Sequence, residues 1–189
     1  MNMSEKTDPA WEKISLKAID SALLKLNRIS AGKWAVDETA VLSAPSPEDY
    51  DAVCVYFEVK KDDEPMNFAL FFDRKDVGFI SKCFIGYHFF VSEKMDGTEE
   101  LLISELGNIL LNSIISALCN SMKIRLIPSI PRTIQAEKSF ALETFSQGLP
   151  ENRGKKKMSV KIKIKCDGRE TFCEVFSFVP ESVAALLKG

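Results

Sequence analysis

The segment from Thr98 to Ser121 limits most strongly how this chain can fold. Each residue of a helix turns by about 100°, so a helix here is apolar around well over half of its circumference. Its apolar positions are Leu102, Ile103, Leu106, Ile109, Leu110, Ile114, Ala117 and Leu118. The narrow remainder holds Ser104, Glu105, Asn108, Asn112 and Ser116, with Leu101 and Ile115 on the same side. Such a helix must bury most of its surface and leave one strip to solvent.

A second helical segment precedes it. Residues 1–8 are polar, and we expect them to form a flexible N-terminus. Asp8-Pro9 then supplies a helix cap and a first-turn proline. Leucine and isoleucine recur at helical spacing from Leu16 to Leu26, and Gly32 is a natural stop. The pattern predicts a helix from about Pro9 to Ala31.

Stretches typical of β-strands follow each long helix. They lie at 34–42, 52–59 and 67–72 after the first, and at 158–166 and 171–178 after the second. Asp167-Gly168 is a hairpin turn between the last two. Residues 123–135 form an extended segment broken by two prolines, 145–157 a polar loop, and 76–85 and 180–188 short helices. Two long helices, each followed by strands, predict an α+β duplication in one domain, 9–189, with halves of about 9–93 and 94–189.

The basic segment from Arg153 to Lys165 has two interpretations. It is either a patch for acidic partners or nucleic acid, or a strand with a lysine outer face. Lysines at 161, 163 and 165 alternate with apolar residues, which favours the strand. Lysines on a strand also discourage pairing between sheet edges.

Composition excludes several classes of function. A net charge of −2 and a pI near 5.6 argue against binding nucleic acid by phosphate neutralisation. His88 is the single histidine, and the five cysteines contain no C-x-x-C pair. We therefore expect no metal site or cofactor, no disulfide framework and a reducing compartment. The N-terminus has no signal-peptide pattern and the most apolar run is shorter than a membrane span, so we expect a cytoplasmic protein without membrane insertion.

The run from Ser104 to Leu110, together with Pro131, resembles the signature of the CheC/CheX/FliY chemotaxis phosphatases. That signature is an Asp or Ser, three residues, Glu, two residues, Asn, 22 residues and Pro. Glu105, Asn108 and Pro131 match its spacing. The first position is occupied by Leu101, which departs from the pattern. The resemblance implies a CheC-like pseudo-two-fold duplication with two long helices packed on an antiparallel β-sheet.

A duplication implies a second copy of the motif in the first half. The segment 21–32 aligns without a gap, and it retains Ser21. Lys25 stands at the glutamate position, Arg28 at the asparagine position and Asp51 at the proline position. We therefore expect the first half to be degenerate, with Lys25 and Arg28 as surface charges.

The resemblance implies hydrolysis of the aspartyl phosphate of a CheY-like response regulator. The partner carries the phosphoryl group and its Mg²⁺, so this chain needs no cofactor of its own. Asn108 would hold a water in line for attack, and Glu105 would pair with a cation of the regulator. Leu101, Ser104 and Asn112 would contact the partner, and Pro131 would be structural.

Two other functions stay open at this stage. Leu101 cannot hydrogen-bond as Asp or Ser would, which leaves a non-catalytic adaptor that binds a receiver domain or a signalling complex. A scaffold whose helical strip contacts no receiver is the third possibility. The resemblance also implies a CheD-like deamidase as a possible partner, and either a monomer or a homodimer.

Overall fold

The computed structural model describes the chain except for residues 1–8, 43, 62–63, 88–92, 148–154 and 187–189. The expected flexible N-terminus and His88 therefore lie outside the described residues. Every cysteine and every residue of the proposed motif lies within them.

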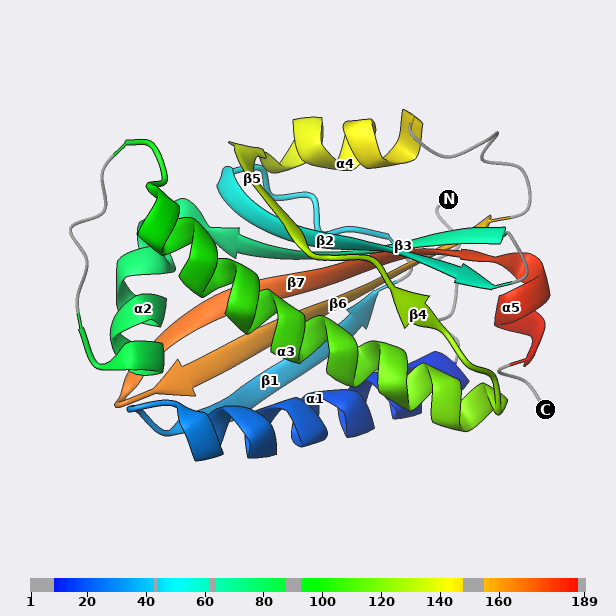
Figure 1. Cartoon of the computed structure of the whole chain (residues 1–189), viewed down its shortest axis with the longest axis horizontal. Helices are drawn as coiled ribbons and strands as arrows, with labels where there is room; N and C mark the ends of the chain where they lie inside the picture. The colour runs from blue at the N-terminus through cyan, green and yellow to red at the C-terminus, as the bar shows by residue number, and fades with distance from the viewer. Residues whose placement is uncertain (1–8, 43, 62–63, 88–92, 148–154, 187–189) are drawn as a thin grey trace, which may run out of the picture.

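Two long helices lie side by side across one face of the sheet (Figure 1). They are α1 (Pro9–Ile29) and α3 (Gly97–Met122), which confirms the two predicted long helices to within two residues at each end. The short helices are α2 (Val77–Ile85), preceded by a 3₁₀ turn at Arg74–Asp76, then α4 (Lys138–Gln147) and α5 (Glu181–Ala185).

The strands of the described chain form one antiparallel sheet of seven strands. They are β1 (Trp34–Leu42), β2 (Asp51–Lys61), β3 (Glu64–Asp73), β4 (Ile127–Pro128), β5 (Arg132–Glu137), β6 (Lys155–Cys166) and β7 (Arg169–Pro180). Their order is β1-β6-β7-β3-β2-β4, and β5 also pairs with β2. In the two halves of the chain, β2 corresponds to β6 and β3 to β7. If each strand is replaced by its counterpart, the same central order is read from the opposite edge of the sheet. The predicted α+β pseudo-two-fold architecture is confirmed.

The main core fills the space between the long helices and one face of the sheet. The two long helices contribute apolar side chains such as Ala18, Leu26, Leu106 and Ile114. The sheet contributes alternate residues of β2, β3, β6 and β7, whose side chains face the helices. A smaller core lies on the opposite face beneath α4, where Phe145 packs with residues such as Phe71 and Phe176.

The sequence did not predict α4. The predicted loop at 145–157 is wrong at both ends, because α4 continues to Gln147 and β6 begins at Lys155. The helix contributes few buried apolar residues, among them Ala141 and Phe145, and so its periodic pattern is weak.

The lysine face of β6 has the predicted alternation but not the predicted role. Val160, Ile162 and Ile164 are buried in the main core, which confirms the half-buried strand. However, β6 pairs with β1 on one side and β7 on the other, so it is an interior strand and its lysines do not protect a sheet edge from pairing. They make ion pairs instead on the sheet face opposite the long helices, which we call the open face. Lys163, for example, pairs with Asp37 and with Glu170, both at 2.8 Å.

A buried ion pair joins α4 to β7 on the same open face of the sheet. Lys138 Nζ lies 2.7 Å from Glu174 Oε2, and both side chains are almost fully buried. Ser46 and Ser159 donate further hydrogen bonds to the Glu174 carboxylate at 2.6–2.8 Å. Burial alone would raise the pKa of Glu174, but the hydrogen bonds from Lys138, Ser159 and Ser46 outweigh it and hold this pKa below its usual 4.5.

This network predicts a specific acid sensitivity. A carboxyl group whose pKa is lower in the folded state stabilises the fold above its unfolded pKa, and this stability is lost as the pH falls through the lowered value. We expect Glu174→Gln to cost about 2 kcal/mol of unfolding free energy at pH 7, and the difference from wild type to shrink below pH 4.5. Urea unfolding across this range measures it, with the exposed Glu12→Gln as a control. An unchanged difference at all pH values would contradict the assignment.

Candidate functional site

Five of the predicted site residues share one face of α3, which we call the α3 strip: Leu101, Ser104, Glu105, Asn108 and Asn112. Leu101 is 72% exposed and Glu105 is also exposed, whereas Ser104, Asn108 and Asn112 are partly buried. Glu105 and Asn108 are three residues apart on a continuous helix, so their side chains are neighbours. The strip therefore offers a carboxylate and a carboxamide to one external partner.

Asn112 fixes the amide of Asn108. Its Nδ2 donates a hydrogen bond of 2.5 Å to Asn108 Oδ1 from one turn further along the helix. One acceptor position of Asn108 Oδ1 is thereby occupied, while a second lone pair of this oxygen and the Nδ2 donors stay available. Asn108 can still accept from one group and donate to another at the same time.

The sequence wrongly placed Ile115 on this strip. Ile115 is only 3% exposed and belongs to the main core. The chain after α3 folds back beside the helix, and Leu126 from this returning segment joins the same core. Because the neighbouring Ser116 is exposed, the solvent-facing strip is narrower at this point than the helical wheel predicts, but it does not end there.

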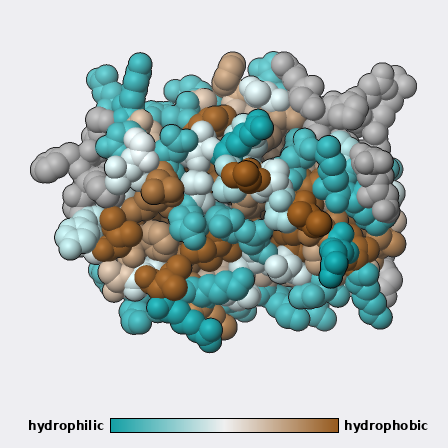
Figure 2. Space-filling view, viewed as in Figure 1, coloured by the Kyte–Doolittle hydropathy of each residue, from teal (hydrophilic) through white to brown (hydrophobic). Residues whose placement is uncertain are grey.

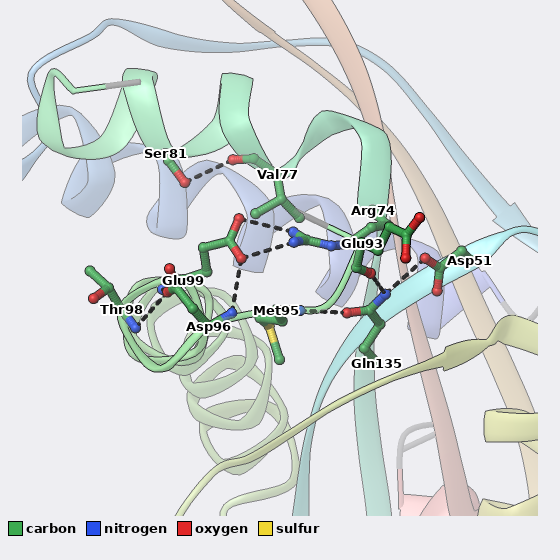
Figure 3. A network of polar contacts seen from close by, with 10 residues as sticks. All are labelled: Asp51, Arg74, Val77, Ser81, Glu93, Met95, Asp96, Thr98, Glu99 and Gln135. Atoms are coloured by element: carbon green, nitrogen blue, oxygen red, sulfur yellow. Dashed lines mark hydrogen bonds and ion pairs between the residues drawn. The ribbon is translucent and has the colours of Figure 1, made fainter. Parts of the chain in front are cut away.

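The start of α3 is held by a network of polar contacts that runs from the surface to a buried ion pair (Figure 3). The Asp96 side chain accepts hydrogen bonds from the backbone N–H groups of Thr98 and Glu99. The Glu99 carboxylate in turn accepts one from the backbone N–H of Asp96, which completes a capping box. Glu99 also forms a two-pronged ion pair with Arg74, with N–O distances of 3.1 and 2.8 Å. Both side chains are buried. The helix that carries the strip is thus anchored to the end of β3.

Gln135 of β5 ties down the segment that enters α3. Its Oε1 accepts from the Met95 backbone at 2.8 Å, and its Nε2 donates to Asp51 and to the Glu93 carbonyl, both at 2.9 Å (Figure 3). The sequence does not indicate that Arg74 and Gln135 hold the start of α3. No local pattern links these residues to α3.

Gly107 lets α3 approach the sheet closely in the middle of the motif. A Cβ atom at this position would lie 2.6 Å from Cβ and Cγ1 of Val55 on β2. A glycine inside a long helix costs stability relative to alanine, so close packing is the reason for it here. Because Gly107 lies between Glu105 and Asn108, this close approach determines how far the α3 strip lies from the sheet.

We expect Gly107→Ala to destabilise the protein by about 1–3 kcal/mol, because the added methyl group overlaps Val55. Gly97→Ala is the matched control in the same helix, where an added Cβ would meet nothing within 4 Å, and it should stay within about 0.5 kcal/mol of wild type. Urea unfolding measures both. Equal stability of the two variants would refute the close-packing role.

The corresponding face of α1 carries different chemistry. Lys25 and Arg28 are exposed, as predicted for surface charges, and Ser21 is exposed beside them. Lys25 Nζ reaches across and donates to Ser113 Oγ of α3 at 3.3 Å. Cations thus occupy the places that hold a carboxylate and an amide on α3.

Pro131 lies in the connection between β4 and β5, beside the edge of β2. There Ser129 exchanges two hydrogen bonds with Glu58, at 2.8 and 3.1 Å. Ile127 of β4 and Ile130 of this connection are strongly exposed. Figure 2 shows hydrophobic patches set among hydrophilic ones on the face that carries α3 and β4.

By length and composition, α3 also passes as a membrane-spanning helix. More than half of its most apolar window is buried inside this fold. Packing against the sheet and α1 accounts for its apolar character.

No family model and no curated protein sequence matches the chain. Several solved structures, in contrast, share the fold of the chain. FliY of Thermotoga maritima superposes with a TM-score of 0.69 at 16% identity, covering 97% of this chain and 96% of that chain. CheX in the CheX–CheY–BeF3–Mg²⁺ complex of Borrelia burgdorferi gives 0.59 at 15% identity, covering 93% and 100%.

The chain has the CheC/CheX/FliY fold. The FliM middle domain of Vibrio alginolyticus shares this fold as well, with a TM-score of 0.53, 12% identity and coverage of 94% and 96%. The CheC/CheX/FliY fold is therefore found in proteins that carry different names, and the fold by itself does not assign an activity to this chain.

Proposed function

We propose that this protein binds a phosphorylated CheY-like receiver domain through the α3 strip and accelerates hydrolysis of its aspartyl phosphate. The observation that carries the proposal is the pairing of the exposed Glu105 with the partly exposed Asn108, whose amide is oriented by Asn112. The shared fold with CheX, solved in complex with CheY, BeF3 and Mg²⁺, supports a receiver as the partner.

The chemistry asked of this chain is small. The receiver supplies the phosphoaspartate and the Mg²⁺ that neutralises it, so no covalent intermediate on this protein is needed. Asn108 accepts a hydrogen bond from the attacking water and donates one to a phosphoryl oxygen, which holds the water in line. Ordering this water lowers the barrier without any general base.

Recognition relies on the residues around Asn108. Glu105 pairs with a cationic side chain of the receiver and fixes the register of docking. The exposed Leu101 makes an apolar contact, and Ser104 hydrogen-bonds at the edge of the interface. Capping and the Arg74–Glu99 pair keep the helix rigid, so that little ordering is needed on binding.

A non-catalytic adaptor is the second candidate, and Leu101 is the observation that favours it. This position holds Asp or Ser in the resembling signature, and here it is a leucine exposed to 72%. An adaptor keeps the apolar docking contact and lacks the rate enhancement.

One experiment separates the two candidates. A receiver domain labelled by a small-molecule phosphodonor is incubated with the full-length protein, and loss of label is followed beside binding of the BeF3-activated receiver. The phosphatase predicts both binding and faster loss of label. Binding with an unchanged rate would identify the adaptor, and absence of binding would exclude both.

A further inference from the structure

Three segments meet at one corner of the molecule, away from the α3 strip. They are the turn between α1 and β1, the end of α2 and the tip of the β6–β7 hairpin, at the left of Figure 1. Backbone hydrogen bonds join the first two, from Ala31 to the Phe84 carbonyl at 3.0 Å and from Gly32 to the Cys83 carbonyl at 2.8 Å. The end of α2 is thus fixed in place.

This corner gathers three metal-binding side chains. The sulfur atoms of Cys83 and Cys166 and a carboxylate oxygen of Asp167 all lie within 4.8 Å of one another. The cysteines are 2% and 1% exposed, whereas Asp167 is exposed. Two sulfur ligands therefore sit inside the protein, and the oxygen ligand stands at the surface where an ion would enter.

The local backbone is shaped around these groups. A Cβ atom on Gly32 would lie 2.6 Å from Cys166 Sγ and 3.3 Å from Asp167 Oδ2, so glycine leaves the space that the sulfur occupies. Asp167 and Gly168 have φ of 48° and 84°, the paired positive values of a tight hairpin turn. This turn holds the carboxylate next to the two sulfurs.

We propose that Cys83, Cys166 and Asp167 form a binding site for a thiophilic divalent ion of the Zn²⁺ class. Two thiolates and one carboxylate are a ligand set that Zn²⁺ accepts, whereas Mg²⁺ and Ca²⁺ prefer oxygen alone. Three protein ligands leave the fourth tetrahedral position to a water on the exposed side. Binding exchanges the two thiol protons for the ion and releases them to solvent.

From the sequence we expected no metal site because it has a single histidine and no C-x-x-C pair. Cys83 and Cys166 come from opposite halves of the chain, and only the packing of α2 against the hairpin brings them together. A bound ion would therefore fasten the hairpin tip to α2. This role is independent of the proposed function of α3.

The test uses the full-length protein, stripped of metal by a chelator and kept reduced. Titration with Co²⁺ should produce a thiolate-to-cobalt charge-transfer band that saturates at one equivalent, and Zn²⁺ should displace it and raise the melting temperature. The Cys83→Ser and Cys166→Ser variants should lose the band. Asp167→Asn, which suits the same turn, should weaken the affinity by roughly tenfold or more.

Cys119→Ser is the matched control, because it removes a partly exposed cysteine of α3 and should leave the titration unchanged. Circular dichroism without metal confirms that each variant is folded. Two results of the cobalt titration would overturn the proposal: the absence of a charge-transfer band, or a band that survives in the Cys83→Ser/Cys166→Ser double variant. A third result would also overturn it: reduced protein binds no Zn²⁺, and the same protein forms a Cys83–Cys166 disulfide in air.

Discussion

Asn108→Ala is expected to lower the acceleration of receiver dephosphorylation by roughly 100-fold, because the variant can no longer hold a water in line. Asn108 is partly exposed, and we expect its loss to change the stability of the protein little. Binding of the BeF3-activated receiver should stay within about threefold, since Glu105 and Leu101 still contact it. The rate is measured as loss of label from the phosphorylated receiver at saturating concentrations of each variant.

Asn120→Ala is the matched control for this prediction. It removes the same kind of side chain from an exposed position of the same helix, outside the α3 strip. The control should dephosphorylate the receiver as fast as wild type. If Asn108→Ala and Asn120→Ala behave alike, the hydrolytic role of the strip is refuted, while an adaptor role survives wherever Glu105→Ala weakens binding.

Glu99→Ala is expected to cost about 3–5 kcal/mol of unfolding free energy. The substitution takes the carboxylate away from the buried guanidinium of Arg74 and breaks the capping box with Asp96 at the same time. Urea unfolding followed by circular dichroism measures the loss. An effect of this size could unfold a marginally stable domain, so the variant should first be studied at low temperature.

Glu100→Ala is the matched control, because it removes an exposed carboxylate from the same helical turn and should cost below about 0.5 kcal/mol. The double variant Arg74→Met/Glu99→Leu should recover part of the loss, since it leaves no buried charge behind. A Glu99→Ala variant as stable as Glu100→Ala would show that the buried pair does not anchor α3.

Much of this fold can be predicted from local patterns. The apolar periodicity of α1 and α3 gave their positions, and the alternation of Val160, Ile162 and Ile164 with lysines gave the strand β6. Asp167-Gly168 gave the hairpin turn, and both residues have the positive φ that this turn requires. In each case the residues that decide the structure are close neighbours in sequence.

The features that the sequence missed depend on contacts between distant residues. Ile115 lies on the polar side of the helical wheel, but it is buried in the same core as Leu126 of the returning segment. Arg74 and Glu99 are 25 residues apart, and no periodicity links them. The helix α4 was not predicted because it buries few apolar residues, and its first residue, Lys138, is of a type usually found at surfaces but is buried against Glu174.

The two-fold symmetry of the strand order bears on how many receiver domains one chain can bind. A fold whose halves exchange on rotation offers two equivalent outer helices, and therefore room for two partners on one chain. Lys25 and Arg28 occupy the first of these positions, so the second half alone presents a carboxylate beside an amide. One molecule of this protein should accordingly bind one receiver, with a simple hyperbolic isotherm and no cooperativity between sites.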